Sequence, residues 1–236
     1  MEDSSIDITT CSQSEFEATK LYQSIYGYVE AYMSNYDASH DFNHILRVVA
    51  LAKKIFYLES QLPLNENFKS VNWPTVILAA FLHDVGDKKY VKPGDDAEHI
   101  VRDLLLSHGC TRQWADTIAT VVKNVSFSNE IKNPTQVQEV LKKHPELAIV
   151  QDADRLDAIG AVGIARTFAF GAVKASARGL QGSVEHFVEK LENLEGMMKT
   201  DMGRQLARER TRRLKEFRGW WEEEESVLTW KANGSI

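Results

Sequence analysis

Two polar residues, His83 and Asp84, directly follow the most apolar stretch of this 236-residue chain. The run Val76-Ile-Leu-Ala-Ala-Phe-Leu82 has the composition of a helix that is buried on every side. Its end delivers an imidazole and a carboxylate into a region of low dielectric, where an unpaired charge is costly. A metal cation would satisfy both side chains at once, although a hydrogen-bonded histidine–aspartate pair is the simpler explanation of this dipeptide alone.

Two further polar residues fall on faces that the pattern predicts to be buried. His44 begins a stripe of apolar residues at helical spacing that continues through Val48, Leu51, Ile55 and Leu58. Asp154, unlike Asp152, lies on the apolar stripe of a long helical pattern made up of Val150, Ala158, Ala161, Ala165 and Phe168. A lone buried histidine is usually a hydrogen-bonded core residue, but an unpaired buried carboxylate would be protonated or destabilising.

One explanation covers all of these residues: a single divalent ion held by two imidazoles and two carboxylates from three helices. The predicted ligands are His44, His83, Asp84 and Asp154. Imidazole and carboxylate ligands without thiolate favour octahedral Mn, Fe, Ni, Co or Mg over a closed structural zinc site.

The elements that must position these residues are all predicted to be helices. Helical spacing or capping residues predict helices over 15–33, from Asn43, from Pro74, over 100–108, from Thr111, over 134–144, over 146–170, from Ser183 and over 206–228. The stretches 126–133 and 171–182 are expected to be loops. Because no convincing alternating strand, repeat or linker is present, the sequence predicts an all-α, single-domain helical bundle over 15–236, preceded by a flexible N-terminus, 1–14.

Composition limits the partners of the protein. A net charge of −6 argues weakly against broad nucleic-acid binding, and the N-terminus lacks the basic and apolar regions of a secretory signal. No apolar run approaches the length of a membrane span, so no membrane partner is expected. The two distant cysteines, Cys11 and Cys110, fit a reducing compartment. We expect a cytoplasmic protein, with the nucleus and a homodimeric state left open.

The order of the candidate ligands resembles a known family signature. His44, then His83-Asp84, then Asp154 is similar to the H…HD…D motif of the HD-domain phosphohydrolases, an all-helical, metal-dependent superfamily. The segments around the motif, 44–48, 83–89, 151–169 and 186–191, resemble the small bacterial-type HD proteins with nucleoside triphosphate pyrophosphohydrolase activity. The resemblance extends from about Asp37 to Arg210. It implies an HD-domain fold and release of pyrophosphate and a nucleoside monophosphate; the 171–182 loop is shorter than is usual in this branch.

Three residues just beyond the His-Asp pair are predicted to take part in catalysis or phosphate binding. Asp87 lies four residues after His83 and is the candidate to orient or deprotonate the attacking water, as the family pattern also implies. A capping or surface carboxylate is the alternative for this residue. The resemblance favours Lys89 as a phosphate contact. Lys88 is a further candidate, although it also suits a solvated charge run.

Further cations are candidates to balance the charge of a phosphate substrate. His186 and Lys190 share a helical face and suit a triphosphate clamp, although an exposed pair is an equal alternative. The remaining candidates for substrate binding are Arg155, Arg166 and Arg208. Phe127 is a candidate to stack on a base, although an aromatic residue after a helix more often packs in the core.

The favoured function is therefore metal-dependent hydrolysis of nucleoside triphosphates, including deoxynucleotides. A nucleoside monophosphatase or phosphodiesterase with the same metal site remains an alternative. An alternative of another class is a nucleotide-binding sensor without turnover.

Overall fold

The computed structural model describes residues 11–34, 36–37, 39–62, 68, 70–86, 99–174 and 176–230. These residues form helices and contain no strand, so the all-α prediction is confirmed. The helices are α1 (Gln13–Glu17), α2 (Lys20–Met33), α3 (Phe42–Ser60), α4 (Trp73–Leu82), α5 (Ile100–Ser107), α6 (Arg112–Lys123), α7 (Phe127–Lys132), α8 (Pro134–Lys143), α9 (Glu146–Asp157), α10 (Gly160–Lys174), α11 (Gly179–Glu189) and α12 (Asp201–Glu225).

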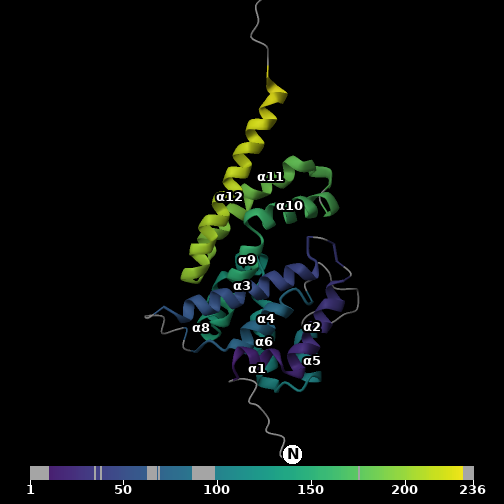
Figure 1. Cartoon of the computed structure of the whole chain (residues 1–236), viewed down its shortest axis with the longest axis vertical. Coiled ribbons are helices and arrows are strands. Elements are labelled where there is room, and N and C mark those ends of the chain that lie inside the picture. Colours follow the sequence, from purple (N-terminus) through teal and green to yellow (C-terminus); the bar gives the residue numbers. More distant parts are fainter. Residues whose placement is uncertain are drawn as a thin grey trace, which may run out of the picture.

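The helices gather into two parts (Figure 1). The larger part contains α1 to α9, and the smaller part contains α10, α11 and the C-terminal half of α12. In the larger part, α4 is the central helix, because every residue from Pro74 to Leu82 is buried. It packs against α2, α3, α6 and α9. Asn72 begins this helix by accepting a hydrogen bond from the backbone N–H of Thr75.

Helix α3 begins two residues earlier than the sequence predicts. Asp41, rather than Asn43, is the N-terminal cap, and its carboxylate accepts a hydrogen bond from the backbone N–H of His44. His44 therefore lies in the first turn of α3, and its side chain is buried, as its position on the apolar stripe predicts.

The prediction of a single helix over 146–170 is wrong, because the chain bends by 70° between α9 and α10. The bend occurs at Gly160, whose φ of +75° is readily adopted only by glycine. The side chain of Arg210 fills the space beside this residue, where an added Cβ would lie 3.1 Å from its Cγ atom. The apolar pattern continues through the bend, so periodicity alone does not show it.

Two stretches expected to be loops contain helix. Ser126 caps the short helix α7, and its hydroxyl accepts from the backbone N–H of Asn129. In the second stretch, α10 continues to Lys174 and α11 begins at Gly179. The N-cap of α11 is Arg178 rather than Ser183, so the helix starts five residues earlier than expected.

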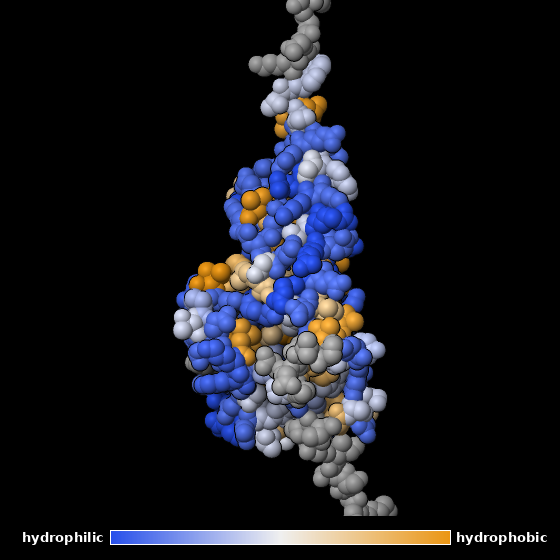
Figure 2. Space-filling model, turned by 90° about the vertical axis from the view of Figure 1, so that its left-hand side faces the viewer, coloured by the Kyte–Doolittle hydropathy of each residue, from blue (hydrophilic) through white to orange (hydrophobic). Residues whose placement is uncertain are grey.

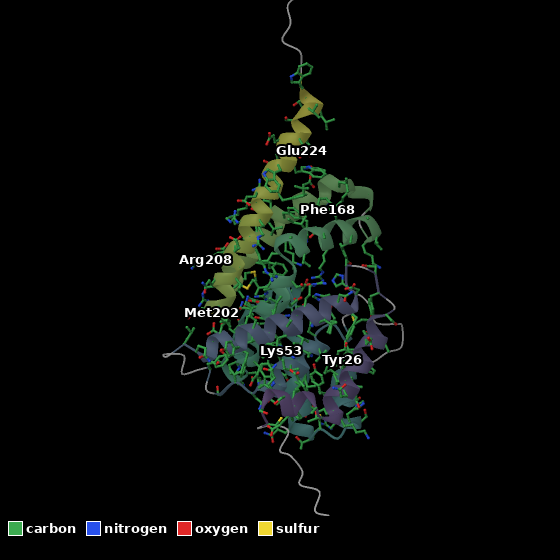
Figure 3. All side chains as sticks on the ribbon, viewed as in Figure 1. Tyr26, Lys53, Phe168, Met202, Arg208 and Glu224 are labelled. Carbon is green, nitrogen blue, oxygen red and sulfur yellow. The ribbon has the colours of Figure 1, made fainter. Side chains whose placement is uncertain are left out.

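The smaller part is held together by aromatic rings from three helices. Phe168 of α10, labelled in Figure 3, has its ring centroid 6.1 Å from that of Phe187 and 5.8 Å from those of both Phe217 and Trp221. Beyond this cluster, α12 extends past the neighbouring helices (Figure 1). Figure 2 shows hydrophobic atoms near this end, where Val227 and Leu228 are exposed.

No single helix in the described ranges has the length and apolarity to cross a membrane. Only the bent pair α9 and α10 meets that test, and only when the two helices are taken together.

Candidate metal centre

Two buried imidazoles face each other where α3 begins and α4 ends. The Nε2 atom of His44 lies 3.2 Å from the Nε2 atom of His83. The Nδ1 atom of His83 lies 2.8 Å from the carbonyl oxygen of Ala80, which can only accept a hydrogen bond. His83 therefore carries its proton on Nδ1, and its Nε2 lone pair points toward His44 when the ring is neutral.

Two carboxylates complete the group. Asp84 places its Oδ2 atom 3.3 Å from Nε2 of His44 and its Oδ1 atom 3.6 Å from Nε2 of His83. The Oδ1 atom of Asp154 lies 3.7 Å from the Nε2 atoms of both histidines. The structure thus brings together all four residues that the sequence predicts as ligands.

The donor set fits a divalent cation. Ligand atoms of His44, His83 and Asp84 lie within 4.8 Å of one another. Within the described part of the chain, the buried Oδ2 atom of Asp84 accepts no hydrogen bond. Burial would raise the pKa of this carboxyl, but the two imidazoles outweigh that effect and hold the pKa well below its ordinary value. A buried, ionised and unpartnered oxygen beside two imidazoles is the environment that a bound cation would satisfy.

Asp152 is more buried, and Asp154 more exposed, than the sequence predicts. Asp152, predicted to lie off the buried face, is completely buried, because its carboxylate accepts from the backbone N–H groups of Lys199 and Thr200 and from the Thr200 hydroxyl. These groups lie at the N-terminus of α12, where a carboxylate is favourable. Asp154 keeps 27% of its side chain exposed, compared with 15% for Asp84 and 1% for His44. It is therefore the ligand candidate nearest to solvent.

Asp157 and Arg47 also belong to the site, although the sequence reasoning missed them. The Oδ2 atom of Asp157 lies 2.8 Å from Nδ1 of His44. Arg47 donates to Asp157 through Nε at 2.7 Å and through Nη2 at 3.1 Å. Their spacing was an available signal, since each lies three residues after a predicted ligand, on the same helical face.

Arg166, predicted to bind substrate, reaches the site through Asp157. Its Nη1 atom donates to Oδ2 of Asp157 at 3.0 Å, and its Nε atom donates to the carbonyl oxygen of Ser39 at 2.7 Å. His40 lies on the same side, with its ring centroid 5.9 Å from that of His44.

Arg155 does not contact the four clustered residues. Its side chain is only 2% exposed and donates to the carboxylate of Glu130 and, at 3.0 Å, to the carbonyl oxygen of Met197. Lys199 donates to the other oxygen of Glu130 at 2.8 Å. We therefore correct the expectation for Arg155: it belongs to a buried ion pair that links α9 to α7 and to the segment before α12.

Arg208, also predicted to bind substrate, lies on the exposed surface of α12. It is exposed and lines a surface hollow of about 450 Å³ together with Thr211, Arg212 and Lys215. Figure 3 shows it on the side of α12 that faces away from α10. The arginine that turns inward is Arg210, which donates to the carbonyl oxygen of Leu156 at the end of α9.

The remaining substrate candidates form a second group. The Nζ atom of Lys190 lies 4.7 Å from the ring centroid of Phe127, a cation–π geometry that joins the end of α11 to the start of α7. His186 lies one turn before Lys190 and has its Nδ1 atom 3.7 Å from Glu189. Asp87, Lys88 and Lys89 lie outside the described residues, so their roles stay predictions.

The comparisons with known proteins agree with this geometry. A family model described as HD domain matches residues 41–159. The Bacillus subtilis protein YpgQ is 35% identical over 198 residues, which are 81% of this chain and 87% of YpgQ. The crystal structure of YpgQ in complex with ADP has a TM-score of 0.65 at 31% identity and covers 86% of this chain and 96% of its own.

An HD-superfamily hydrolase from Bacillus thuringiensis has a TM-score of 0.61 at 26% identity, with 89% of this chain and 97% of its own covered. The family match contains His44, His83, Asp84 and Asp154, the four residues that converge in the structure. The chain belongs to the HD-domain phosphohydrolase superfamily.

Proposed function

We propose that this protein is a metal-dependent phosphohydrolase that cleaves nucleoside triphosphates, including deoxynucleotides, to a nucleoside monophosphate and pyrophosphate. The observation that carries the metal-dependent part is the convergence of His44, His83, Asp84 and Asp154, with a buried Asp84 oxygen that has no hydrogen-bond partner in the described structure. These four residues would hold one divalent ion, of which Mn, Fe, Ni, Co and Mg all suit the ligand types.

A nucleotide substrate is supported by the relative YpgQ, whose crystal structure contains ADP. In the present chain, Phe127 offers an aromatic face for a base, and Lys190 offers a cation for a phosphate within 4.7 Å of that ring. Cleavage between the α and β phosphates follows from the resemblance to the pyrophosphohydrolase branch.

The chemistry divides between the metal and the chain. When bound, a divalent ion supplies Lewis acidity and lowers the pKa of a coordinated water. Asp154, the most exposed of the four ligand candidates, lies where substrate and water would reach the site. We assign Asp87 to orient or deprotonate the attacking water, and Lys89 to contact a phosphate, as predicted from the sequence.

A product assay tests this function. Purified protein is incubated with Mn²⁺ and a panel of nucleoside triphosphates, diphosphates, monophosphates and a phosphodiester, in water enriched in ¹⁸O. We expect equal amounts of pyrophosphate and nucleoside monophosphate, with the ¹⁸O label in the monophosphate, because attack at the α phosphorus places the water oxygen there.

Other products would identify the alternatives. Orthophosphate from monophosphates, or cleavage of the phosphodiester, would replace the proposed reaction with a monophosphatase or phosphodiesterase. Nucleotide binding without any product would indicate a sensor. Asp84→Asn is the matched control, because it removes a ligand charge without changing the size of the side chain; it is expected to abolish turnover.

A further inference from the structure

Asp157 lies at a junction of three helices directly behind His44. Its side chain is 1% exposed and belongs to α9, and its carboxylate is contacted by side chains from α3 and α10. The Oδ2 atom is 2.8 Å from Nδ1 of His44 and 3.0 Å from Nη1 of Arg166. Arg47 contacts both oxygens, with Nε 2.7 Å from Oδ1 and Nη2 3.1 Å from Oδ2.

The two guanidinium groups determine the state of this carboxylate. Arginine nitrogens only donate hydrogen bonds, so both oxygens of Asp157 must act as acceptors. Two guanidinium cations, Arg47 and Arg166, donate hydrogen bonds to this one buried carboxyl, and opposite charges at such short range favour its ionised form. An ionised carboxylate has no proton to give, so the hydrogen in the contact with His44 must lie on Nδ1.

The position of this hydrogen matters because His44 has two alternatives in the metal-free protein. Its Nε2 atom lies 3.2 Å from Nε2 of His83, and a proton on Nε2 of His44 would form a hydrogen bond between the two rings. That tautomer would block Nε2 of His44 as a metal ligand. The tautomer with the proton on Nδ1 leaves lone pairs on both Nε2 atoms, directed at the same space.

We propose that Asp157 is a positioning residue that fixes His44 in the Nδ1–H tautomer and thereby presents its Nε2 lone pair to the metal. This inference rests on the metal site of the proposed function, but it does not depend on the substrate. Arg47 and Arg166 hold the carboxylate in place, and Arg166 also donates to the carbonyl oxygen of Ser39. The guanidinium of Arg166 thus acts on the site through Asp157 rather than by direct contact with the metal ligands.

The tautomer is measured directly by NMR. Metal-free protein labelled with ¹⁵N at histidine is examined at a pH above which the ¹⁵N shifts of the ring nitrogens no longer change. We expect His44 to show a protonated Nδ1 and an unprotonated Nε2 in the wild type, and to gain the Nε2–H form in Asp157→Asn. His83 is an internal control, because its Nδ1 is bonded to the carbonyl of Ala80 in both proteins.

Metal affinity supplies the second measurement. Replacement of a residue that orients a ligating histidine typically weakens metal binding about 10- to 100-fold, and we expect a loss of this size for Asp157→Asn with Mn²⁺ by electron paramagnetic resonance titration. Asp116→Asn is the matched control, since this aspartate is exposed and paired with Arg112 on α6. It should leave the affinity unchanged.

The outcomes separate this inference from the proposed function. A wild-type His44 protonated on Nε2, or an Asp157→Asn variant with unchanged tautomer and affinity, would overturn the role of Asp157, whatever reaction the enzyme catalyses. If the NMR and Mn²⁺ results are as expected but the protein does not hydrolyse nucleotides, only the proposed nucleotide substrate is rejected. If Asp157→Asn does not fold, Arg47→Gln keeps the carboxylate and tests the same junction, with the Nδ1–H tautomer expected to persist and Mn²⁺ affinity to fall less.

Discussion

Replacement of Arg155 by methionine tests whether this arginine is structural or binds substrate. The guanidinium is 2% exposed and donates to Glu130 and to the Met197 carbonyl, so the change leaves a nearly buried carboxylate with Lys199 as its remaining cation. Loss of one partner of a buried ion pair costs about 3–5 kcal/mol. Because Lys199 stays 2.8 Å from Glu130, we expect the lower end of that range, about 3 kcal/mol.

The assay combines thermal unfolding with steady-state kinetics. For a chain of this size, each 1 kcal/mol shifts the midpoint by about 2–4 °C, so the expected decrease is about 6–12 °C. The KM for a nucleotide should stay near the wild-type value below the transition. The double variant Arg155→Met with Glu130→Leu should lose less stability than the sum of the single changes, since the interaction between these two residues is then lost only once.

The opposite pattern would refute this reasoning. A large increase in KM with an unchanged unfolding midpoint would mean that Arg155 contacts substrate and that its pairing with Glu130 contributes little.

Three further predictions follow from other residues. Asp84→Asn should lose Mn²⁺ binding by calorimetry, and a chelator should inactivate the wild type, whereas turnover that survives both treatments would place the chemistry elsewhere. Burial raises the pKa of Glu130, but Lys199 and Arg155 outweigh burial and lower the pKa below its ordinary 4.5. The ionised Glu130 carboxylate should therefore stabilise the fold above pH 4.5, and this contribution should be lost as the pH falls through the lowered pKa. Chemical denaturation of Glu130→Gln should accordingly show a shallower dependence of stability on acid pH. Gly160→Ala should lower the free energy of unfolding by about 1–3 kcal/mol, because Gly160 has a φ of +75° and faces Arg210. Gly219→Ala is the control: Gly219 has open space around it in α12, so this change should be neutral or slightly stabilising. Equal thermal midpoints for the two variants would contradict the strain at the bend.

The ligand set was predictable because its members lie on strongly patterned helices. The wholly apolar run before His83 and the stripe that His44 begins both indicate burial, and the structure places the Nε2 atoms of the two residues 3.2 Å apart. Only one physical need, a cation among buried donors, was required to connect residues far apart in sequence.

The errors have a common cause in long-range contacts. Asp152 is buried because it meets the start of α12, 48 positions later, and Arg155 pairs with Glu130, 25 positions earlier. Periodicity within one helix carries no information about such partners. The bend at Gly160 was missed for a similar reason, since apolar residues continue on both sides of it while the backbone turns.

The convergence of residues from three separate helices has a consequence for the lifetime of the protein. His44 and His83 are 39 positions apart and meet only in the native fold, so an unfolded chain offers no comparable site. With the proposed ion at 100 times its dissociation constant, mass action would add about 2.7 kcal/mol to folding. Scarcity of the ion would then reduce the abundance of the protein through faster proteolysis, in addition to stopping its reaction.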